Sequence, residues 1–114
     1  MLKRSKRIHG RSVVKRILED GTPHPGPFLN AITLENELDQ TRYAVIVGKK
    51  LARSAATRNR KRRQIYEIIR ILEKNKTIAS DRKFDIVLMV RSPAMKSNYT
   101  ELESALKKHL AFLA

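Results

Sequence analysis

The sequence predicts an α+β fold, a single-domain α-β sandwich over residues 1–114 with its elements in the order α-β-β-α-β-α. Three observations support this prediction: helical apolar periodicity at 65–72, an uninterrupted apolar run at 86–90, and prolines and glycines between the remaining apolar stretches. A chain of 114 residues is long enough for one hydrophobic core. It has no internal repeat or low-complexity tract, so no second domain is expected.

One short helix and two strands are expected in the first part of the chain. The helix is indicated by the spacing of Val13, Val14, Ile17 and Leu18, and Gly21 stands where a helix C-terminus favours glycine. Residues 22–27 contain three prolines and are predicted to form a turn or loop. Strands are predicted at 28–34 and 42–47, and we expect them to pair as antiparallel neighbours because they are close in sequence.

A long helix, a buried strand and a closing helix are expected in the second part. The i, i+3, i+4, i+7 spacing that predicts an amphipathic helix, ending at about Lys74, belongs to Ile65, Ile68, Ile69 and Leu72. Residues 84–90 are apolar on both faces from Ile86 onward, as in an interior strand, and Ser92-Pro93 stops this strand. The final helix begins at about Asn98. The segment 42–90 is compatible with a parallel crossover, whose hand the pattern leaves open.

The composition favours a phosphate-rich partner. Lys and Arg number 25 against 11 Asp and Glu, which gives a formal net charge of +14. The absence of cysteine excludes disulfides, thiolate metal sites and thiol nucleophiles. The run 86–90 is too short to span a bilayer, and Lys3 to Arg7 are not followed by a secretory apolar region, so a soluble, cytoplasmic protein is expected.

The most informative segment is 49–63, which holds eight basic side chains and no acid. Its second half runs into the apolar pattern from Ile65, so these cations occupy the first turns of the long helix. Each cation at a helix N-terminus costs about 0.3–1 kcal/mol, because that end carries the positive pole of the helix dipole. A polyanion that contacts the arginines and the free helix N–H groups offsets this cost. We therefore predict a nucleic-acid site here, and the alternative is a solvated excess of charge.

The basic segment resembles the signature of the protein subunit of bacterial ribonuclease P. In that family a strand ends in a Lys-Lys-like pair, a loop follows, and an Arg-Asn-Arg motif opens a helix; the matching residues are Lys49-Lys50 and Arg58-Asn59-Arg60-Lys61-Arg62-Arg63. The resemblance extends to Arg7-Ile8, to Gly21 and to Arg91-Ser92-Pro93-Ala94. The sequence departs from the family at Leu51-Ala52-Arg53, where the loop is one residue longer and lacks the usual glycine. Val14 and Leu18 also replace aromatics that the family often has on its first helix.

The resemblance implies a left-handed crossover around the basic helix and two surfaces that face RNA. The first surface would contact the catalytic RNA through Lys49, Lys50, Arg53, Arg58, Asn59, Arg60, Arg62 and Arg63. The second would be a cleft between the first helix and the sheet that holds the single-stranded 5′ leader of precursor tRNA. Its residues would be Val14, Lys15, Leu18, Phe28, Tyr43, Arg91 and Val45 or its neighbours.

The function implied by the resemblance is that of the protein component of the ribonuclease P ribonucleoprotein, an endonuclease that matures the 5′ end of tRNA. The expected partners are the catalytic RNA and precursor tRNA, with no membrane and no DNA. Catalysis would reside in the RNA, with Mg²⁺ in the holoenzyme and no cofactor on the protein alone. The alternative is a small structural RNA-binding protein of the ribosomal type, which the composition by itself favours.

The residues predict no catalytic or metal site in the protein alone. His9, His24 and His109 stand apart from one another and from acids at metal-ligand spacing. Asp81 with Asp85 is more easily a strand-entry pair than a two-metal carboxylate site. A stand-alone nuclease would require a carboxylate or histidine cluster, which the sequence does not provide.

Several single residues have more than one interpretation. Arg63 stands one turn before Glu67, so a surface ion pair competes with RNA contact, whereas no acid lies within one turn of Arg58, Arg60 or Arg62. Asn59 is expected to cap the helix, and the alternatives are that it holds a backbone turn or positions a hydrated magnesium shared with RNA phosphates. Tyr43 and Tyr66 are considered as residues that stack on bases. His109, Phe84 and Phe112 are expected to pack in the core.

Overall fold

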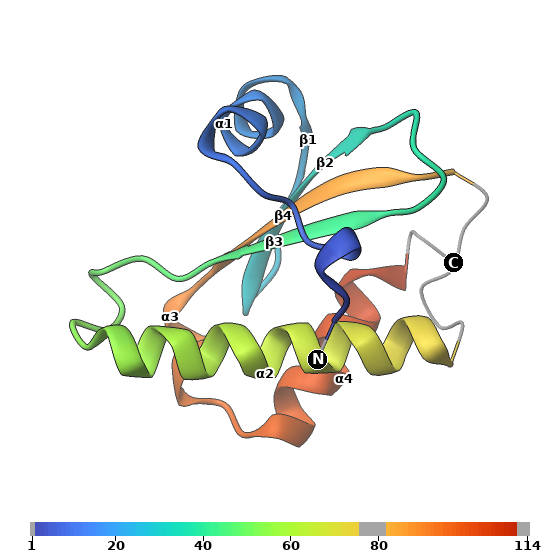
Figure 1. Ribbon diagram of the computed structural model, residues 1–114. Coiled ribbons are helices and arrows are strands. Elements are labelled where there is room, and N and C mark those ends of the chain that lie inside the picture. Colours follow the sequence, from blue (N-terminus) through green and yellow to red (C-terminus); the bar gives the residue numbers. More distant parts are fainter. Residues whose placement is uncertain (1, 76–81, 112–114) are drawn as a thin grey trace.

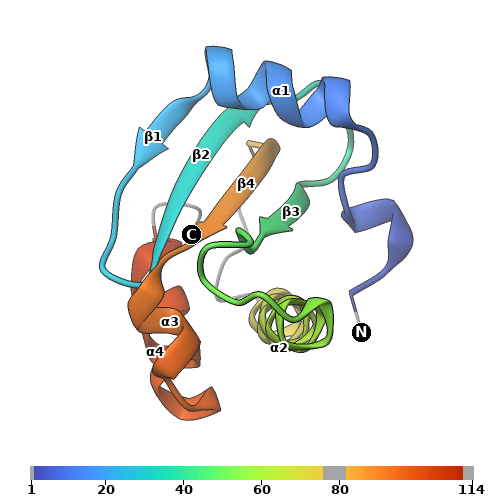
Figure 2. The same cartoon turned by 90° about the vertical axis from the view of Figure 1, so that its left-hand side faces the viewer.

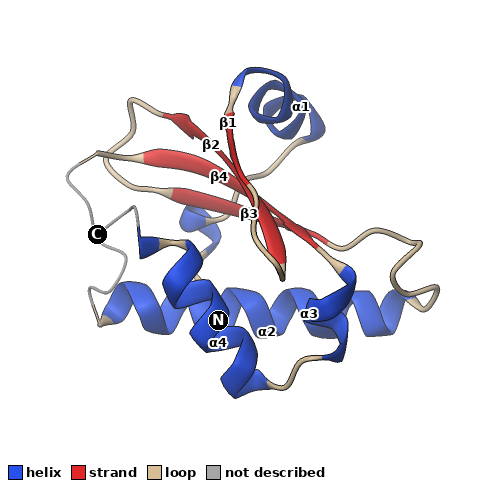
Figure 3. Ribbon diagram, turned by 180° about the vertical axis from the view of Figure 1, so that it is seen from behind, coloured by secondary structure: helices blue, strands red, loops and turns tan. Residues whose placement is uncertain are grey.

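The computed structural model describes residues 2–75 and 82–111 as one four-stranded sheet with helices on both faces (Figure 1). This confirms the predicted α+β class. In chain order the elements are a 3₁₀ turn η1 (Arg4–Lys6), α1 (Arg11–Asp20), β1 (Thr22–His24), β2 (Leu29–Glu35), β3 (Arg42–Ile46), α2 (Ala55–Lys74), β4 (Phe84–Val90), α3 (Ser92–Lys96) and α4 (Tyr99–His109). Helix α1 covers one face of the sheet, and α2 and α4 cover the other (Figures 2 and 3). Within the described ranges no helix is both long enough and apolar enough to cross a membrane.

The strands lie in the order β1-β2-β4-β3, so β4 is central. It pairs antiparallel with β2 and parallel with β3, and Val87 of β4 stands opposite Ile32 on one side and Ala44 on the other. The prediction that 28–34 and 42–47 are antiparallel neighbours is therefore wrong. The apolar strand β4 separates them, because a strand that is apolar on both faces is best placed in the middle of the sheet. The parallel pairing of β3 and β4 confirms a parallel crossover through α2, and its hand stays a prediction.

Three short elements were not predicted, and the first is the 3₁₀ turn η1. Thr22–His24 form an edge strand, with Pro23 opposite Ile32, where a turn or loop was expected. Proline is tolerated there because an edge strand has one side without ladder hydrogen bonds. Beyond β4 the chain forms α3, a single helical turn with Pro93 in its first positions, before the closing helix.

The core is divided by the sheet. The larger cluster lies between the sheet and α2 with α4, and it includes Tyr43, Val45, Ile65, Ile68, Leu88 and Leu106. The smaller cluster lies under α1 and contains Ile8, Ile17, Ala44 and Val87. Because side chains alternate along a strand, Tyr43 and Val45 face α2 whereas Ala44 and Ile46 face α1.

Helix α1 ends at Gly21, as predicted, but for a different reason than a left-handed conformation. The φ of Gly21 is −77°, which any residue adopts. A Cβ there would lie 2.5 Å from the Ile17 carbonyl oxygen and 2.7 Å from Cγ2 of Ile32. Glycine thus allows the chain to leave α1 directly against β2, which fixes α1 above the sheet.

Among the described residues, the ion pair between Arg42 and Asp85 lies largely buried at the end of the sheet and joins β3 to β4. Arg42 donates two hydrogen bonds to the carboxylate of Asp85, from Nε at 2.8 Å and from Nη2 at 2.6 Å, and the Asn36 amide donates a third at 2.9 Å. These contacts fasten the β2–β3 connection to the sheet. Asp85 therefore has a structural role, while its expected strand-entry partner Asp81 lies outside the described residues.

Candidate nucleic-acid interface

The basic segment forms the start of α2, as predicted. Ser54 is the N-cap, and its hydroxyl accepts a hydrogen bond from the Thr57 N–H at 3.4 Å. The helix begins at Ala55 and its first turn has no acid. Asn59 consequently lies inside the helix, so the expectation that it caps the helix is wrong. The cap is a serine further upstream, at the end of the loop that precedes the helix.

Arg58 holds the loop that precedes α2. Its Nη1 donates to the carbonyl oxygens of Ala52 and Arg53, each at 2.8 Å. One guanidinium nitrogen thereby ties two consecutive loop residues to the first turn of the helix. The loop also carries Lys49 and Lys50, so Arg58 sets the position of three other cations.

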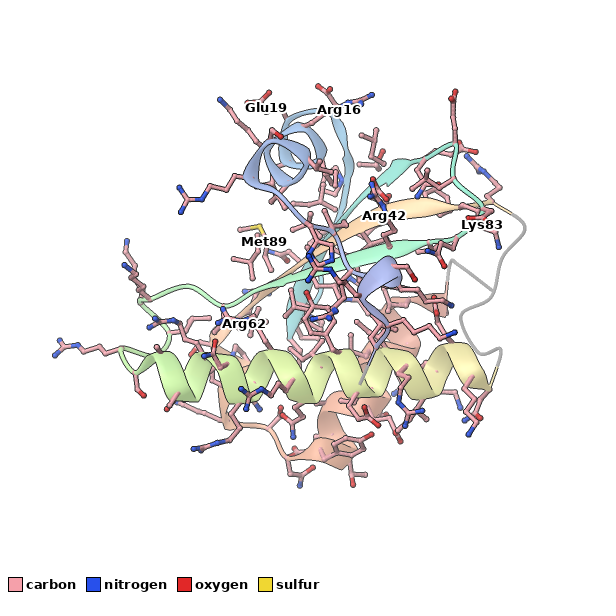
Figure 4. The ribbon with its side chains drawn as sticks, in the orientation of Figure 1. Arg16, Glu19, Arg42, Arg62, Lys83 and Met89 are labelled. Carbon is pink, nitrogen blue, oxygen red and sulfur yellow. The ribbon has the colours of Figure 1, made fainter. Side chains whose placement is uncertain are left out.

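Asn59 and Arg62 form a pair one helical turn apart. The Asn59 side-chain oxygen accepts a hydrogen bond from Nη2 of Arg62, and both side chains are half-buried. Figure 4 shows Arg62 between α2 and the strands above it. The Arg62 guanidinium is thus held in one orientation, which lowers the entropy that it would lose when it binds an anion.

Lys61 forms hydrogen bonds to other residues of the protein. Its Nζ donates to the Gln64 side-chain oxygen at 2.8 Å and to the Ser97 carbonyl oxygen at 3.5 Å, which links α2 to the connection between α3 and α4. Burial lowers the pKa of Lys61 from its ordinary value. This lysine therefore contributes to the packing of α2 on α4.

Five other cations of the segment are exposed and, within the described ranges, donate to no side chain or carbonyl oxygen: Lys49, Lys50, Arg53, Arg60 and Arg63. The ion pair considered between Arg63 and Glu67 does not form. Glu67 instead accepts from Nη2 of Arg70 at 2.5 Å, and this hydrogen bond lowers the pKa of Glu67 to about 2. Arg63 is left available for an external anion.

The residues expected to form a leader cleft do not share one surface. Val14, Lys15 and Leu18 lie on α1 around a hollow of about 420 Å³ that also includes Gly10 and Arg11. Tyr43 and Val45 are 0% and 6% exposed on the opposite face of the sheet. There the Tyr43 hydroxyl donates to Glu73 at 2.9 Å, so Tyr43 is a core residue and is not available to stack on a base. Placing these two strand residues in the α1 cleft was wrong because the alternation of the strand turns them toward α2.

The other residues considered for RNA contact lie at the rim or in the core. Phe28 is half-buried and packs against the α2 side of the core. Arg91 is exposed, and its Nη1 donates to the Gly26 carbonyl oxygen at 2.6 Å. The Tyr66 hydroxyl accepts from the Val45 N–H at 3.1 Å, which satisfies a donor at the edge of β3.

The α1 side of the sheet contains surface residues that the sequence reasoning missed. Asn30, Met89 and Ile46 are register neighbours on β2, β4 and β3, and Met89 is 36% exposed. Figure 4 shows Met89 on the side of the sheet that carries α1. The signal was present in the alternation, since Met89 is two residues from Val87 and therefore on the same face. Leu18, which is 39% exposed, and Met89 both add exposed apolar area on this side.

The described histidines and Asp85 have structural partners. His24 lies 3.1 Å from the Thr33 hydroxyl, and His109 lies 2.6 Å from the His24 carbonyl oxygen. No three acidic or histidine side chains of residues 2–75 and 82–111 gather where they would hold a metal ion. His109 and Phe84 are half-buried in packed positions, as expected, and Phe112 lies outside the described residues.

Comparison with known proteins places these features in a family. A family model described as Ribonuclease P matches residues 2–113. The ribonuclease P protein component of Pseudanabaena sp. is 33% identical over 114 residues, with 97% of this chain and 93% of the relative covered. That of Syntrophomonas wolfei is 33% identical over 103 residues, covering 90% and 82%. The solved ribonuclease P protein of Staphylococcus aureus has a TM-score of 0.79 at 26% identity, with 94% of both chains covered. The fold is also that of the Thermotoga maritima protein, with a TM-score of 0.79 at 21% identity and coverage of 95% and 97%.

Proposed function

The chain belongs to the ribonuclease P protein family, and on that premise we propose that it binds the catalytic RNA of ribonuclease P and the 5′ leader of precursor tRNA. By doing so it promotes maturation of the tRNA 5′ end. The observation that carries this proposal is the group of exposed cations around the start of α2 that have no partner among the described residues, where the helix has no acid in its first turn. Such an arrangement is unfavourable without an anion and favourable with one.

The basic segment divides its work between positioning and contact. Arg58 holds the loop and Asn59 braces Arg62, so these side chains pre-organise the surface. Arg60 and Arg63 reach outward and contact phosphates of the catalytic RNA. Arginine suits this role because its forked donors bind two phosphate oxygens at once.

The surface between α1 and the exposed part of the sheet receives the leader. Leu18 and Met89 offer apolar area to the faces of bases, and Lys15 and Arg11, which line the same hollow on α1 as Leu18, contact the phosphates. Contacts to base faces and backbone tolerate many sequences, which suits a leader that differs among tRNA precursors.

Hydrolysis is carried out by the RNA with Mg²⁺ that the RNA binds. The support from this chain is that Asp85, His24 and His109 are engaged in contacts that hold strands and helices together. In this proposal the protein contributes binding and orientation, and the groups that carry out hydrolysis belong to the RNA and its Mg²⁺.

The proposal is tested by cleavage of precursor tRNA at low magnesium by the ribonuclease P RNA of the source organism, with and without the protein. We expect the protein to lower the magnesium concentration needed for half-maximal cleavage. Substrates with and without a 5′ leader separate the two surfaces, because only the leader-containing substrate should lose affinity when Leu18 and Met89 are changed to Ser. No stimulation of either substrate would contradict the proposal.

A further inference from the structure

The N-terminal segment and the second half of α2 enclose a hollow of about 400 Å³. It is lined by Leu2, Lys3, Lys6, Arg70, Glu73 and Lys74. The segment is held in place at three points. Leu2 is 3% exposed in the core, and the Ser5 carbonyl oxygen accepts a hydrogen bond from the Gln40 side-chain amide at 2.8 Å. The Ile8 N–H donates to the Tyr43 carbonyl oxygen at 2.7 Å. The fold therefore fixes where Lys3 stands relative to α2.

The charged side chains that line this hollow differ in whether they already have a partner in the protein. Glu73 is the acid among its lining residues, and both of its oxygens are used, one by Lys6 at 2.5 Å and the other by the Tyr43 hydroxyl at 2.9 Å. Arg70 is paired with Glu67. Lys3 and Lys74 are exposed and have no partner among the residues that the structure describes. The hollow thus presents two free cations beside an acid that is already neutralised.

The hollow lies further along the side of α2 that carries Arg63. Arg63, Arg70 and Lys74 are seven and four residues apart, so they lie on one strip of α2. At 1.5 Å per residue, Arg63 and Lys74 are about 16 Å apart along the helix axis. A small anion reaches only one end of this strip. A ligand with regularly spaced phosphates contacts both ends at once.

We propose that the hollow between the N-terminal segment and α2 is a second binding site for the phosphate backbone of the same RNA, with Lys3 and Lys74 as its contacts. The inference rests on the proposed function and extends its surface along α2, away from the helix N-terminus. Each of the two lysines displaces counterions from the RNA, so the pair should strengthen binding in a salt-dependent way.

The first test is the salt dependence of binding to in vitro transcribed ribonuclease P RNA of the source organism. The variant is Lys3→Ala with Lys74→Ala, and the matched control is Lys107→Ala with Lys108→Ala. Both double variants lose two exposed charges, and Lys74, Lys107 and Lys108 all lie in the last turn of their helices. Helix α4 lies on the opposite side of α2 from η1 (Figure 2).

We expect the Lys3/Lys74 variant to bind roughly tenfold more weakly at physiological salt, with a slope of log K against log salt that is shallower by about 1.5. The control should keep the wild-type slope within about 0.5. Wild-type binding by the Lys3/Lys74 variant overturns the second site and leaves the proposed function standing. Equal losses in both double variants also overturn it, because total charge then explains the effect. Wild-type protein that binds this RNA without salt dependence overturns both proposals.

A second test locates the RNA directly and does not depend on affinity. The chain has no cysteine, so Lys74→Cys and Lys107→Cys each provide one attachment point for a tethered iron–EDTA cleavage reagent. The RNA backbone should be cut from position 74 and left intact from position 107. A Lys74→Cys conjugate that binds the RNA and cuts no nucleotide would overturn the inference.

Discussion

At the scale of single residues, the arginines that open α2 differ in what they do before any RNA arrives. Arg58 already makes two hydrogen bonds to carbonyl oxygens of the loop, whereas Arg60 has no described partner. The same residue type therefore serves two purposes within three positions. A substitution at each should separate stability from binding.

We expect Arg60→Ala to weaken binding to the catalytic RNA by about 2 kcal/mol, as for a lost hydrogen bond to a charged group. The free energy of unfolding should change by less than about 0.5 kcal/mol, because the side chain is exposed and pairs with no residue in 2–75 or 82–111. Filter binding and urea denaturation measure the two quantities.

Arg58→Ala is the comparison for this prediction. It removes two hydrogen bonds at the helix start, so it should destabilise the protein by about 1–2 kcal/mol and also weaken RNA binding, since the loop loses its anchor. An Arg58→Ala protein as stable as wild type, or an Arg60→Ala protein that binds like wild type, would contradict this division of roles.

Tyr43 should make stability depend on alkaline pH. Burial, together with the negative charge of Glu73 beside it, raises the pKa of the Tyr43 hydroxyl above its ordinary value. Because the folded pKa lies above the unfolded one, this group contributes stability below about pH 10 and the contribution is lost as the pH rises further. In an ultraviolet titration of the three tyrosines, we expect Tyr43 to ionise only as the protein unfolds. Tyr43→Phe should remove that late step, and a tyrosine titration complete before unfolding would refute the assignment.

At the scale of elements, α2 combines a side that packs in the core with a strip of cations that is proposed to bind RNA. Its inner side carries Ile65, Ile68, Ile69 and Leu72, of which the first three are 0% exposed. Its N-terminal turns and outer strip carry the cations. Burial of the inner side stabilises a helix whose N-terminal charges oppose its dipole. The two properties occupy different sides, so they should respond to different substitutions.

Ile68→Ala should cost about 2–4 kcal/mol of stability through the cavity that it leaves. RNA affinity should be unchanged for the folded fraction, because Ile68 lies on the side away from the solvent. Denaturant unfolding and RNA binding below the unfolding transition measure the two effects. Ile71→Ala is the matched control, since Ile71 is the same residue type in a half-buried position of the same helix and should cost less. Equal destabilisation by both substitutions would be inconsistent with the described packing.

At the scale of the whole molecule, the effect of the net charge of +14 on binding depends on where the unpaired cations lie. The acids Glu67, Glu73 and Asp85 are paired with basic side chains, while six cations of the α2 start face outward or are braced for contact. The binding surface is therefore more positive than the average of the chain. Binding should be correspondingly sensitive to salt.

If those six cations, Lys49, Lys50, Arg53, Arg60, Arg62 and Arg63, each neutralise one phosphate, log K should fall against log salt with a slope of about −4 to −5. The Lys3/Lys74 variant should show this slope, and the wild-type protein a steeper one if the second site also binds. Titrations from low to moderate salt measure it. A slope near zero would exclude a phosphate-dominated interface.

Features that depend on local patterns were predictable from the sequence alone. The helical period predicted α2 and placed its start in the basic motif, and the apolar run predicted β4. The closing helix was expected from about Asn98, which is the N-cap of α4 and forms a reciprocal capping box with Glu101. The basic motif sufficed to indicate the family, which the comparisons confirm. Each of these signals lies within a few residues of chain, where sequence spacing and spatial neighbourhood coincide.

Tertiary structure alone decided which residues meet. It placed β4 between β2 and β3 and turned Tyr43 and Val45 away from α1. It also left Met89 exposed on the side of the sheet that carries α1. It also brought Lys3 of the N-terminus beside Lys74 of α2. These outcomes follow from strand pairing and burial between segments far apart in the chain, which local spacing does not encode. The sequence thus determined where the basic and apolar residues lie along each element, and the packing of those elements decided which of them are buried and which are exposed.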